Sequence, residues 1–288
     1  MNRQTITAVI PAYNEEDNIA RCLESLAWVD KLIVYSSGDD KTAEIAKSMG
    51  AEVRVYRKRT KPDFTLVQKE INDAIEKCQT DWLLRVDADE VVTEGLKREI
   101  STLLSNKSQV TNYPTSPREL GSALGAGKQV TSSKLQGTED NLILTPVAYG
   151  VPRKQFFLGH FLKGGDWAYD RLVRLFKPQF CKYDPIVKVH EQFKVDGEVG
   201  YLQNPLDHYS HPNLKTLLQK FDIYTSLEAE ELKISKLKAF GKMLFNPPNI
   251  FARWFFYHYG YRDGIYGILA GALRGYYDFL LYWKYLNT

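Results

Sequence analysis

The segment WLLRVDADEVV, which spans residues 82–92, contains three carboxylates within a stretch of four residues: Asp87, Asp89 and Glu90. Asp87 and Asp89 are separated by one residue, so both side chains lie on the same side wherever strand geometry continues. Two carboxylates this close repel each other unless one is protonated or a cation joins them. Oxygen ligands favour Mg²⁺ or Mn²⁺, which are commonly shared between carboxylates and phosphate oxygens. The pattern predicts a divalent-cation site; the alternative is an acidic turn that caps a helix after Thr93.

The acidic residues follow one of several short apolar segments in the N-terminal part of the chain. We expect strands at residues 5–10, 31–36, 52–56 and 81–86, and helices between them at 14–26, 42–49 and 67–78. Asn14 is the expected cap of the first helix. Strands that alternate with helices predict βαβ units and a parallel sheet. Such sheets bind ligands beyond the carboxyl ends of their strands, which is where the acids lie.

The chain changes character twice after this region. Residues 105–148 are rich in Ser, Thr, Gly, Pro and Asn, which predicts a long surface excursion. Residues 211–288 show helical spacing and many aromatic side chains. We therefore predict an α/β domain over 1–210 that includes the excursion, and a helical, aromatic-rich, membrane-proximal extension over 211–288.

The composition excludes several classes of protein. An apolar content of 44% and a charged content of 25% over 288 residues are typical of a globular protein. A net charge of +3 is too small to indicate a nucleic-acid partner. Three scattered cysteines without a CxxC pair argue against a disulfide framework or a structural zinc site, and suit a reducing cytoplasm. We expect neither a signal peptide nor a membrane-spanning helix.

Several motifs, taken in order, resemble one known family. They are ITAVIPAYNEE, YSSGDDKT and VDADE in the first half, and PRKQFFLG, GGDWAYDRLVRLF, VKVHE and LDHYSH in the second. Together they resemble the family 2 glycosyltransferases, in the branch of the lipopolysaccharide-core β-glucosyltransferases. The resemblance covers nearly all of the chain except 105–148. It implies a GT-A-like (Rossmann-like), mostly parallel α/β sheet flanked by helices, with a C-terminal helical extension.

The resemblance also implies roles for individual residues on the donor side. Asp89 would bind Mn²⁺ or Mg²⁺ directly, and Asp87 would lie near the ribose and the metal. The metal would neutralise the diphosphate leaving group as the sugar C1–O bond breaks. The implied donor-binding residues are Pro11, Tyr13, Glu15, Tyr35, Gln68, Lys69, Asp87 and Arg171. Lys69 could equally be a solvated charge on its helix.

Tyr35 departs from the family pattern, in which the second strand usually ends in Asp. Tyr35 could stack on the nucleotide base, or Asp39 could take the place of the missing carboxylate. A nucleotide other than uridine, or a weakened site, would also fit the change. A UDP-sugar is therefore the default donor.

The acceptor side depends on acids further along the chain. Asp166, Asp170 and Glu191 are placed to act as general base on an acceptor hydroxyl. We favour Glu191, because it ends a short β-rich run as Asp87 does, whereas Asp166 beside Trp167 suits the holding of acceptor hydroxyls. The alternative for Glu191 is a structural salt bridge with an arginine.

The remaining candidates each have more than one reading. His190 could be a third metal ligand, a charge partner or a core residue. Trp167 could support an acceptor sugar ring or belong to the core. Arg171 and Arg174 could meet donor phosphates or lie on the outer face of their strand.

The resemblance thus implies an inverting, metal-dependent hexosyltransferase. It would move a hexose, by default glucose, from a nucleotide-diphosphate sugar to a hydroxyl of a lipid-linked or lipopolysaccharide-type glycan. Aromatic residues between Phe251 and Trp283, interleaved with Arg253 and Arg262, predict peripheral attachment to the inner face of the plasma membrane. The alternative is that they pack within a helical subdomain. The alternative function is a nucleotide-sugar- or glycan-binding protein without activity; a nucleotidyltransferase would need a GxGxRxxP-like opening that the sequence lacks.

Overall fold

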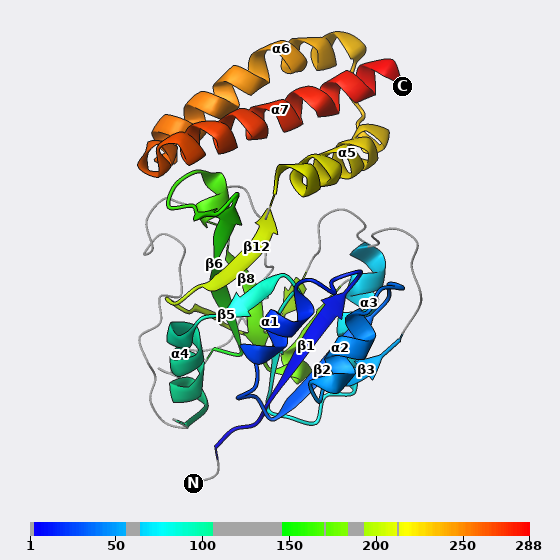
Figure 1. Ribbon diagram of the computed structural model, residues 1–288, viewed down its shortest axis with the longest axis vertical. Coiled ribbons are helices and arrows are strands. Elements are labelled where there is room, and N and C mark those ends of the chain that lie inside the picture. The colour runs from blue at the N-terminus through cyan, green and yellow to red at the C-terminus, as the bar shows by residue number, and fades with distance from the viewer. Residues whose placement is uncertain (1–2, 56–63, 106–145, 170, 184–192, 212) are drawn as a thin grey trace, which may run out of the picture. The chain divides into compact units, whose positions relative to one another are not determined.

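The computed structural model describes residues 3–55, 64–105, 146–169, 171–183, 193–211 and 213–288 (Figure 1). Most of the excursion predicted at 105–148 lies outside these residues. The chain divides into two compact units. The first contains Met1–Arg153 and Arg171–Asp207, and the second contains Lys154–Asp170 and His208–Thr288.

The first unit is built on a mixed β-sheet with helices packed against it (Figure 1). Its elements are β1 (Ile6–Ala12), α1 (Ile19–Glu24), β2 (Lys31–Ser36), α2 (Thr42–Ser48), β3 (Glu52–Arg54), α3 (Phe64–Glu76), β4 (Trp82–Arg85), β5 (Glu90–Val92), α4 (Glu94–Ser105), β6 (Ala148–Phe157), β8 (Arg171–Phe176), η3 (Pro178–Phe180), β9 (Cys181–Tyr183), β10 (Phe193–Val195), β11 (Val199–Tyr201) and β12 (Leu206–His211). Strands β6 and β12 continue into the second unit. The strand order of the main sheet is β3-β2-β1-β4-β8-β6-β12-β5.

Both faces of this sheet are covered. Ile6, Ala8 and Ile10 of β1 belong to one apolar cluster, which includes side chains of α1, α2 and α4. Val9, between them, belongs to a second cluster with side chains of α3, β9 and β10. Successive residues of a strand point to opposite faces, so a strand buried on both faces needs a continuous apolar run. ITAVI in β1 is such a run except for the buried Thr7, and the predicted α/β fold is confirmed.

The parallel strands end at one edge of the sheet. In the registers, Pro11 of β1 pairs with Tyr35 of β2, and Val9 of β1 pairs with Arg85 of β4. The loops that follow β1, β2 and β4 therefore begin at the same edge. These loops carry the predicted nucleotide-binding and acidic motifs.

Asn14 does not cap a helix, contrary to the sequence-based prediction. Helix α1 begins at Ile19, and Asn18 is its N-cap residue. Asn14 instead has a φ of 54°, and its side-chain oxygen accepts a hydrogen bond from the backbone N–H of Asp39 at 3.1 Å. A Cβ on Gly38 would lie 2.0 Å from that oxygen, so this contact between the two loops requires glycine.

The second unit is mainly helical. Besides the ends of β6 and β12, it contains β7 (His160–Phe161), η2 (Asp166–Tyr169), α5 (Leu214–Glu231), α6 (Lys236–Ala252), η4 (Arg253–Tyr257), η5 (Gly260–Asp263) and α7 (Ile265–Asn287). Asn213 caps α5 by accepting a hydrogen bond from the N–H of Thr216. Figure 1 shows α6 and α7 running alongside each other. Among the described helices, none is long and apolar enough to cross a membrane.

Candidate active site

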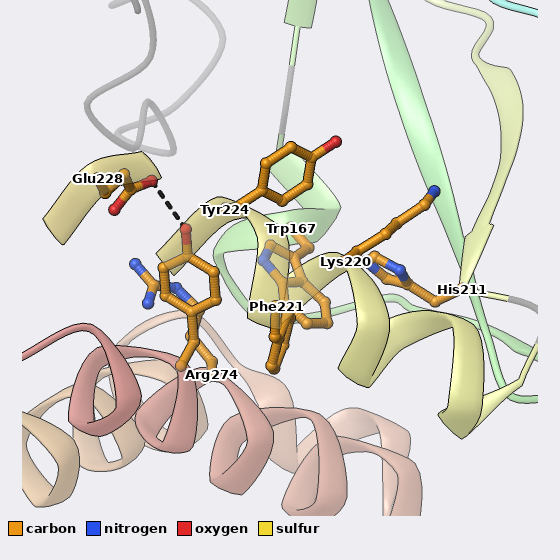
Figure 2. Close-up of a pocket in the computed structure, with 8 residues that line it drawn as sticks. Trp167, His211, Lys220, Phe221, Tyr224, Glu228 and Arg274 are labelled. Carbon is orange, nitrogen blue, oxygen red and sulfur yellow. Dashed lines mark hydrogen bonds between the residues drawn. The ribbon is translucent and has the colours of Figure 1, made fainter. Parts of the chain in front are cut away.

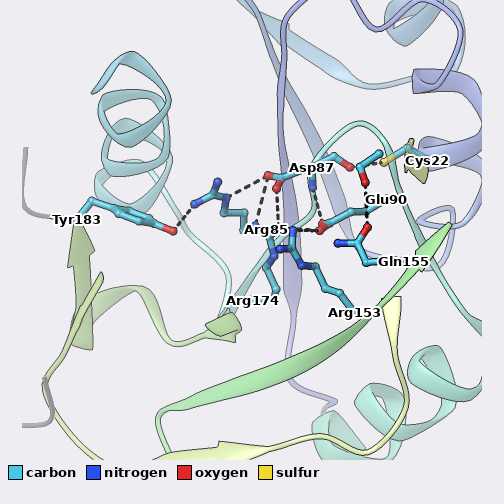
Figure 3. A network of polar contacts seen from close by, with 9 residues as sticks. Cys22, Arg85, Asp87, Glu90, Arg153, Gln155, Arg174 and Tyr183 are labelled. Atoms are coloured by element: carbon cyan, nitrogen blue, oxygen red, sulfur yellow. Dashed lines mark hydrogen bonds and ion pairs between the residues drawn. The ribbon is translucent and has the colours of Figure 1, made fainter. Parts of the chain in front are cut away.

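Asp87, the first residue of the DxD motif, is held by two arginines. Arg174 Nη2 lies 2.5 Å from Asp87 Oδ2, and Arg85 Nε lies 3.3 Å from Asp87 Oδ1 (Figure 3). Burial alone would raise the pKa of the Asp87 carboxyl, but Arg174 and Arg85 hold the pKa well below its usual range. Asp87 is therefore ionised, and its charge is already neutralised by the protein.

Glu90 holds the same loop in place through its buried carboxylate. Its side chain is fully buried, and Oε1 accepts from Arg174 at 2.7 Å and from Arg153 at 3.3 Å. Its other oxygen, Oε2, accepts the backbone N–H of Asp87 at 2.9 Å. The third acid of the motif thus shapes the loop, because it binds both the loop backbone and the arginine that holds Asp87.

A β-bulge positions Arg174. In the antiparallel pairing of β8 with β6, Leu175 is opposite Tyr149 and Val173 is opposite Gly150, so Arg174 is the extra residue. Bulges change the direction of a side chain relative to a regular strand. The sequence suggested donor phosphates or the outer strand face for Arg174. The structure instead pairs it with Asp87 and Glu90, a role that the sequence analysis missed.

The two DxD acids differ in their surroundings. Both Asp87 oxygens are bonded to arginine, whereas Asp89 is half-buried. No group of three His, Cys, Asp or Glu side chains in the described part of the chain could hold a metal. His190 and Glu191 lie outside the described residues. Mg²⁺ often takes only one or two protein carboxylates and completes its shell with phosphate oxygens and water, so Asp89 fits such a site.

The loops after β1 and β2 are tied together beside the acidic loop. The Glu15 N–H donates to Thr42 Oγ1 at 2.9 Å, and the Glu16 N–H donates to Asp40 Oδ2 at 2.9 Å. Asp40 Oδ1 also accepts from the Thr42 hydroxyl at 2.6 Å. Asp40 and Thr42 therefore serve to fix the loop that carries Glu15.

Among the predicted donor-binding residues of that loop, Pro11 is buried, while Tyr13 and Glu15 are half-buried. Glu15 accepts a hydrogen bond from the Asn18 side chain at 2.8 Å. Gln68 and Lys69 are neighbours on α3, but Gln68 is buried and Lys69 is exposed. The two therefore do not share one face of the helix.

Tyr35 lies in the core, which contradicts the predicted stacking on a nucleotide base. Its ring is fully buried in the second apolar cluster. Its hydroxyl donates to Asp73 Oδ2 at 2.6 Å and accepts from Arg54 Nη1 at 2.9 Å. Burial, together with the bond to Asp73, raises the pKa of Tyr35 well above its usual value. Asp39, by contrast, is exposed at the edge of the sheet.

Arg171 lies at the start of β8 and is half-buried. Its Nη1 is buried and has no hydrogen-bond partner among the described residues. Burial lowers the pKa of Arg171, and nearby Tyr201 acts against this shift. A buried guanidinium nitrogen without a partner is suited to an anionic ligand.

Asp166 and Trp167 belong to the second unit, in a turn whose backbone is fixed. The fully buried carboxylate of Asp263 accepts the N–H groups of Lys163, at 3.0 Å, and Gly164, at 2.8 Å. Gly165 has a φ of +80°, and a Cβ there would meet the ring of Trp254 at 2.3 Å.

The two predicted residues emerge from this turn differently. Asp166 Oδ1 is buried and lacks a hydrogen-bond partner in the described part of the chain. Trp167 packs edge-on against Trp254, with ring centroids 5.0 Å apart, and remains half-buried. The turn thus holds one unsatisfied carboxylate oxygen beside one partly accessible aromatic ring.

Comparisons with known proteins agree on one family for the N-terminal part. Residues 7–123 match the profile described as Glycosyl transferase family 2. The chain is 24% identical, over 96% of its length and 89% of the relative, to the lipopolysaccharide core biosynthesis glycosyltransferase LpsC of Rhizobium meliloti. It is 36% identical to an uncharacterized glycosyltransferase of Rickettsia bellii, over 36% of this chain and 34% of that one.

Among solved structures, the chain is similar to S. aureus TarS 1–349 in complex with UDP-GlcNAc. The match has 12% identity and a TM-score of 0.40, and covers 96% of this chain and 80% of that one. A likeness this weak supports no inference about ligands.

Proposed function

We propose that the chain, a glycosyltransferase of family 2, moves a hexose from a nucleotide-diphosphate sugar to a hydroxyl of a lipid-linked or lipopolysaccharide-type glycan. The observation that carries the proposal is the DxD loop at the carboxyl edge of the parallel strands, inside residues 7–123. The name of the Rhizobium relative, which matches over 96% of this chain, supports the acceptor class. UDP-glucose is the default donor.

The donor side of the mechanism assigns separate tasks to the acids. Asp89 would hold Mn²⁺ or Mg²⁺, which when bound would neutralise the charge of the diphosphate leaving group. Arg174 and Arg85 hold Asp87 in its ionised form, and we assign to this carboxylate a bond to the ribose. Tyr13 and Glu15 line the nucleotide pocket in a loop that Asp40 and Thr42 hold in place. Arg171 offers a donor to a phosphate oxygen.

The acceptor side requires a carboxylate that removes the proton of the attacking hydroxyl. Glu191 is the proposed base, and attack on C1 from the face opposite the leaving group inverts that centre. Asp166 is the alternative. Its buried Oδ1, which has no hydrogen-bond partner among the described residues, suits either proton transfer or a bond to an acceptor hydroxyl.

Helices α6 and α7 form a helical hairpin whose surface suits attachment to a membrane. Large apolar side chains are exposed on both of its helices, including Leu237 at 83%, Phe245 at 74% and Ile265 at 70%. The connecting segment adds exposed aromatics, namely Phe256, Tyr257, Tyr259 and Tyr261. Trp254, by contrast, is buried. Exposed apolar and aromatic residues with nearby Lys and Arg favour the headgroup region of a bilayer, and we place the protein at the inner face of the plasma membrane.

The test is a panel of nucleotide sugars with Mn²⁺, read by thermal unfolding and by donor hydrolysis. A donor at about 100 times its Kd stabilises the folded state by roughly 2.7 kcal/mol. We expect one nucleotide sugar to stabilise the protein, to be hydrolysed slowly, and to lose both effects in EDTA. Stabilisation without turnover would identify a binding protein of the same fold. If no nucleotide sugar binds, the proposed function is wrong.

A further inference from the structure

A pocket of about 280 Å³ lies within the second unit (Figure 2). One face of α5 supplies Lys220, Phe221, Tyr224 and Glu228, and α7 supplies two further lining residues. These α5 positions lie three or four residues apart or are adjacent, so a single side of the helix lines the pocket. The pocket is therefore made by regular elements packed against each other.

Aromatic rings form the walls of the pocket, and they pack against one another. Phe221 is 5% exposed and meets Tyr277 of α7 edge-on, with ring centroids 5.0 Å apart. Trp167 contributes from its fixed turn, and its ring centroid lies 5.0 Å from that of His211. Rigid aromatic side chains offer large contact areas at little cost in conformational entropy. The walls are thus preformed for a ligand with an apolar face.

The charges around the pocket are unequal. Arg274 and Lys220 contribute two cations, whereas Glu228 is the single lining acid. Glu228 Oε1 already accepts a hydrogen bond from the Tyr277 hydroxyl at 2.7 Å. Arg274 lies over the Tyr277 ring, 5.5 Å from its centroid, and its Nη1 is buried without a hydrogen-bond partner among the described residues.

Lys220 completes the polar side of the pocket. Its Nζ donates a hydrogen bond to the Ser210 carbonyl at 3.0 Å. Two cations and a single acid beside aromatic walls favour a ligand that combines a ring with a negative charge. The volume of the pocket limits the size of the ligand. At about 280 Å³ it lies near the lower end of the range of roughly 300–1,000 Å³ for ligand pockets, which suits one sugar residue.

We propose that this pocket binds one acidic sugar residue of the acceptor glycan. The sugar ring lies against Trp167 and Phe221, and its carboxylate or phosphate group meets Arg274 and Lys220. The assignment of the ligand to the acceptor rests on the proposed function, whereas the pocket itself lies within a single unit of the chain. An unpaired buried guanidinium nitrogen gains most from an anion, because charged hydrogen bonds are the strong ones.

Ligand-observed saturation-transfer NMR and calorimetry, without any nucleotide sugar, test the proposal. The probes are glucuronate, glucose 6-phosphate, neutral glucose and inorganic phosphate. We expect at least one of the two acidic sugars to bind about tenfold or more tightly than glucose and than phosphate alone. Binding of only glucuronate or only glucose 6-phosphate also supports the site and tells which anion it takes.

Variants locate the binding. Arg274→Gln should weaken binding of the acidic sugar about tenfold or more, Arg274→Lys should weaken it less, and the exposed Arg262→Gln is the matched control with unchanged binding. If Arg274→Gln fails to fold, Lys220→Gln gives the same measurement from α5.

Three results would overturn the proposal: equal binding of glucose, binding of phosphate alone as tightly as glucose 6-phosphate, or full binding by folded Arg274→Gln and Lys220→Gln. Because donor is absent, these results are independent of the nucleotide-sugar panel, whose failure would instead remove the proposed function.

Discussion

Arg174 Nη2 lies 2.5 Å from Asp87 Oδ2, and the same nitrogen lies 2.7 Å from the buried Glu90. One guanidinium therefore pairs with two of the three acids that follow the apolar strand β4, and Arg85 and Arg153 add further positive charge. The sequence explained this cluster of charge by a cation against a diphosphate. In the structure the acids have different roles. Arginines bind Asp87 and Glu90, and Asp89 is the proposed metal ligand.

Removal of Arg174 should strongly destabilise the first unit. Arg174→Met leaves Asp87 and Glu90 without their shared cation, and breaking a buried ion pair by removing one partner lowers the free energy of unfolding by about 3–5 kcal/mol. Urea unfolding measures the change. Arg3→Met, which breaks an exposed pair with Asp30, is the control and should change it by about 0–1 kcal/mol. Equal effects of the two substitutions would show that the network contributes little.

Substitution of the two DxD acids should have different effects on activity and on thermal stability. Asp89→Asn should abolish metal-dependent transfer while the thermal midpoint stays close to that of the wild type, because a neutral amide is a poor ligand for a hard cation. Asp87→Asn should lower the midpoint more and activity less, because it leaves Arg174 partly unpaired. Calorimetry and activity in a titration of Mn²⁺ measure both. Full turnover of the wild type in EDTA would remove the metal site.

Tyr35→Phe should affect stability and leave nucleotide preference unchanged. The substitution removes the hydroxyl that joins Asp73 to Arg54, at a cost of about 1–2 kcal/mol. Competition by UDP, GDP, CDP and dTDP should rank the same in wild type and variant, because the ring is buried. Asp39→Asn is the matched variant, since Asp39 is exposed at the sheet edge. A changed ranking in Tyr35→Phe alone would restore a direct contact with the base.

Strand β2 and its residue Tyr35 together show what the sequence could predict and what it could not. The strands and the sheet edge follow from local apolar runs and their order, and β2 was predicted with its observed bounds, Lys31–Ser36. The positions of Tyr35 and Arg174 depend on contacts with α3 and on a bulge between β8 and β6. Such contacts join segments far apart in the chain and have no local pattern. Asn14 was misassigned for the same reason, because its partner lies in the loop after β2.

Attachment to anionic lipid should depend on the exposed apolar residues of the hairpin. Wild-type protein should float with vesicles that contain phosphatidylserine at low salt, and Leu237→Ser combined with Phe245→Ser should remain at the bottom of the gradient. Both side chains are largely exposed, so their replacement removes membrane contacts and little core packing. Ala252→Ser, also exposed on α6, is the control. Wild-type protein that stays at the bottom at low salt would contradict membrane attachment.

The choice of catalytic base can be decided by two amide substitutions. Glu191→Gln should lower kcat by about 10²–10⁴, the usual contribution of a positioned general base, and should leave donor binding nearly unchanged. Activity should recover partly at higher pH, because a larger fraction of acceptor hydroxyl or water is then deprotonated without help from the protein. Asp166→Asn should mainly raise the KM for the acceptor, because Asp166 lies beside Trp167 in the fixed turn and offers its buried oxygen to a hydroxyl. Single-turnover rates at saturating donor, measured across pH for both variants, separate the two effects. If Glu191→Gln keeps a near-normal kcat while Asp166→Asn loses it, then Asp166 is the base, and its buried carboxylate is the group that takes the proton.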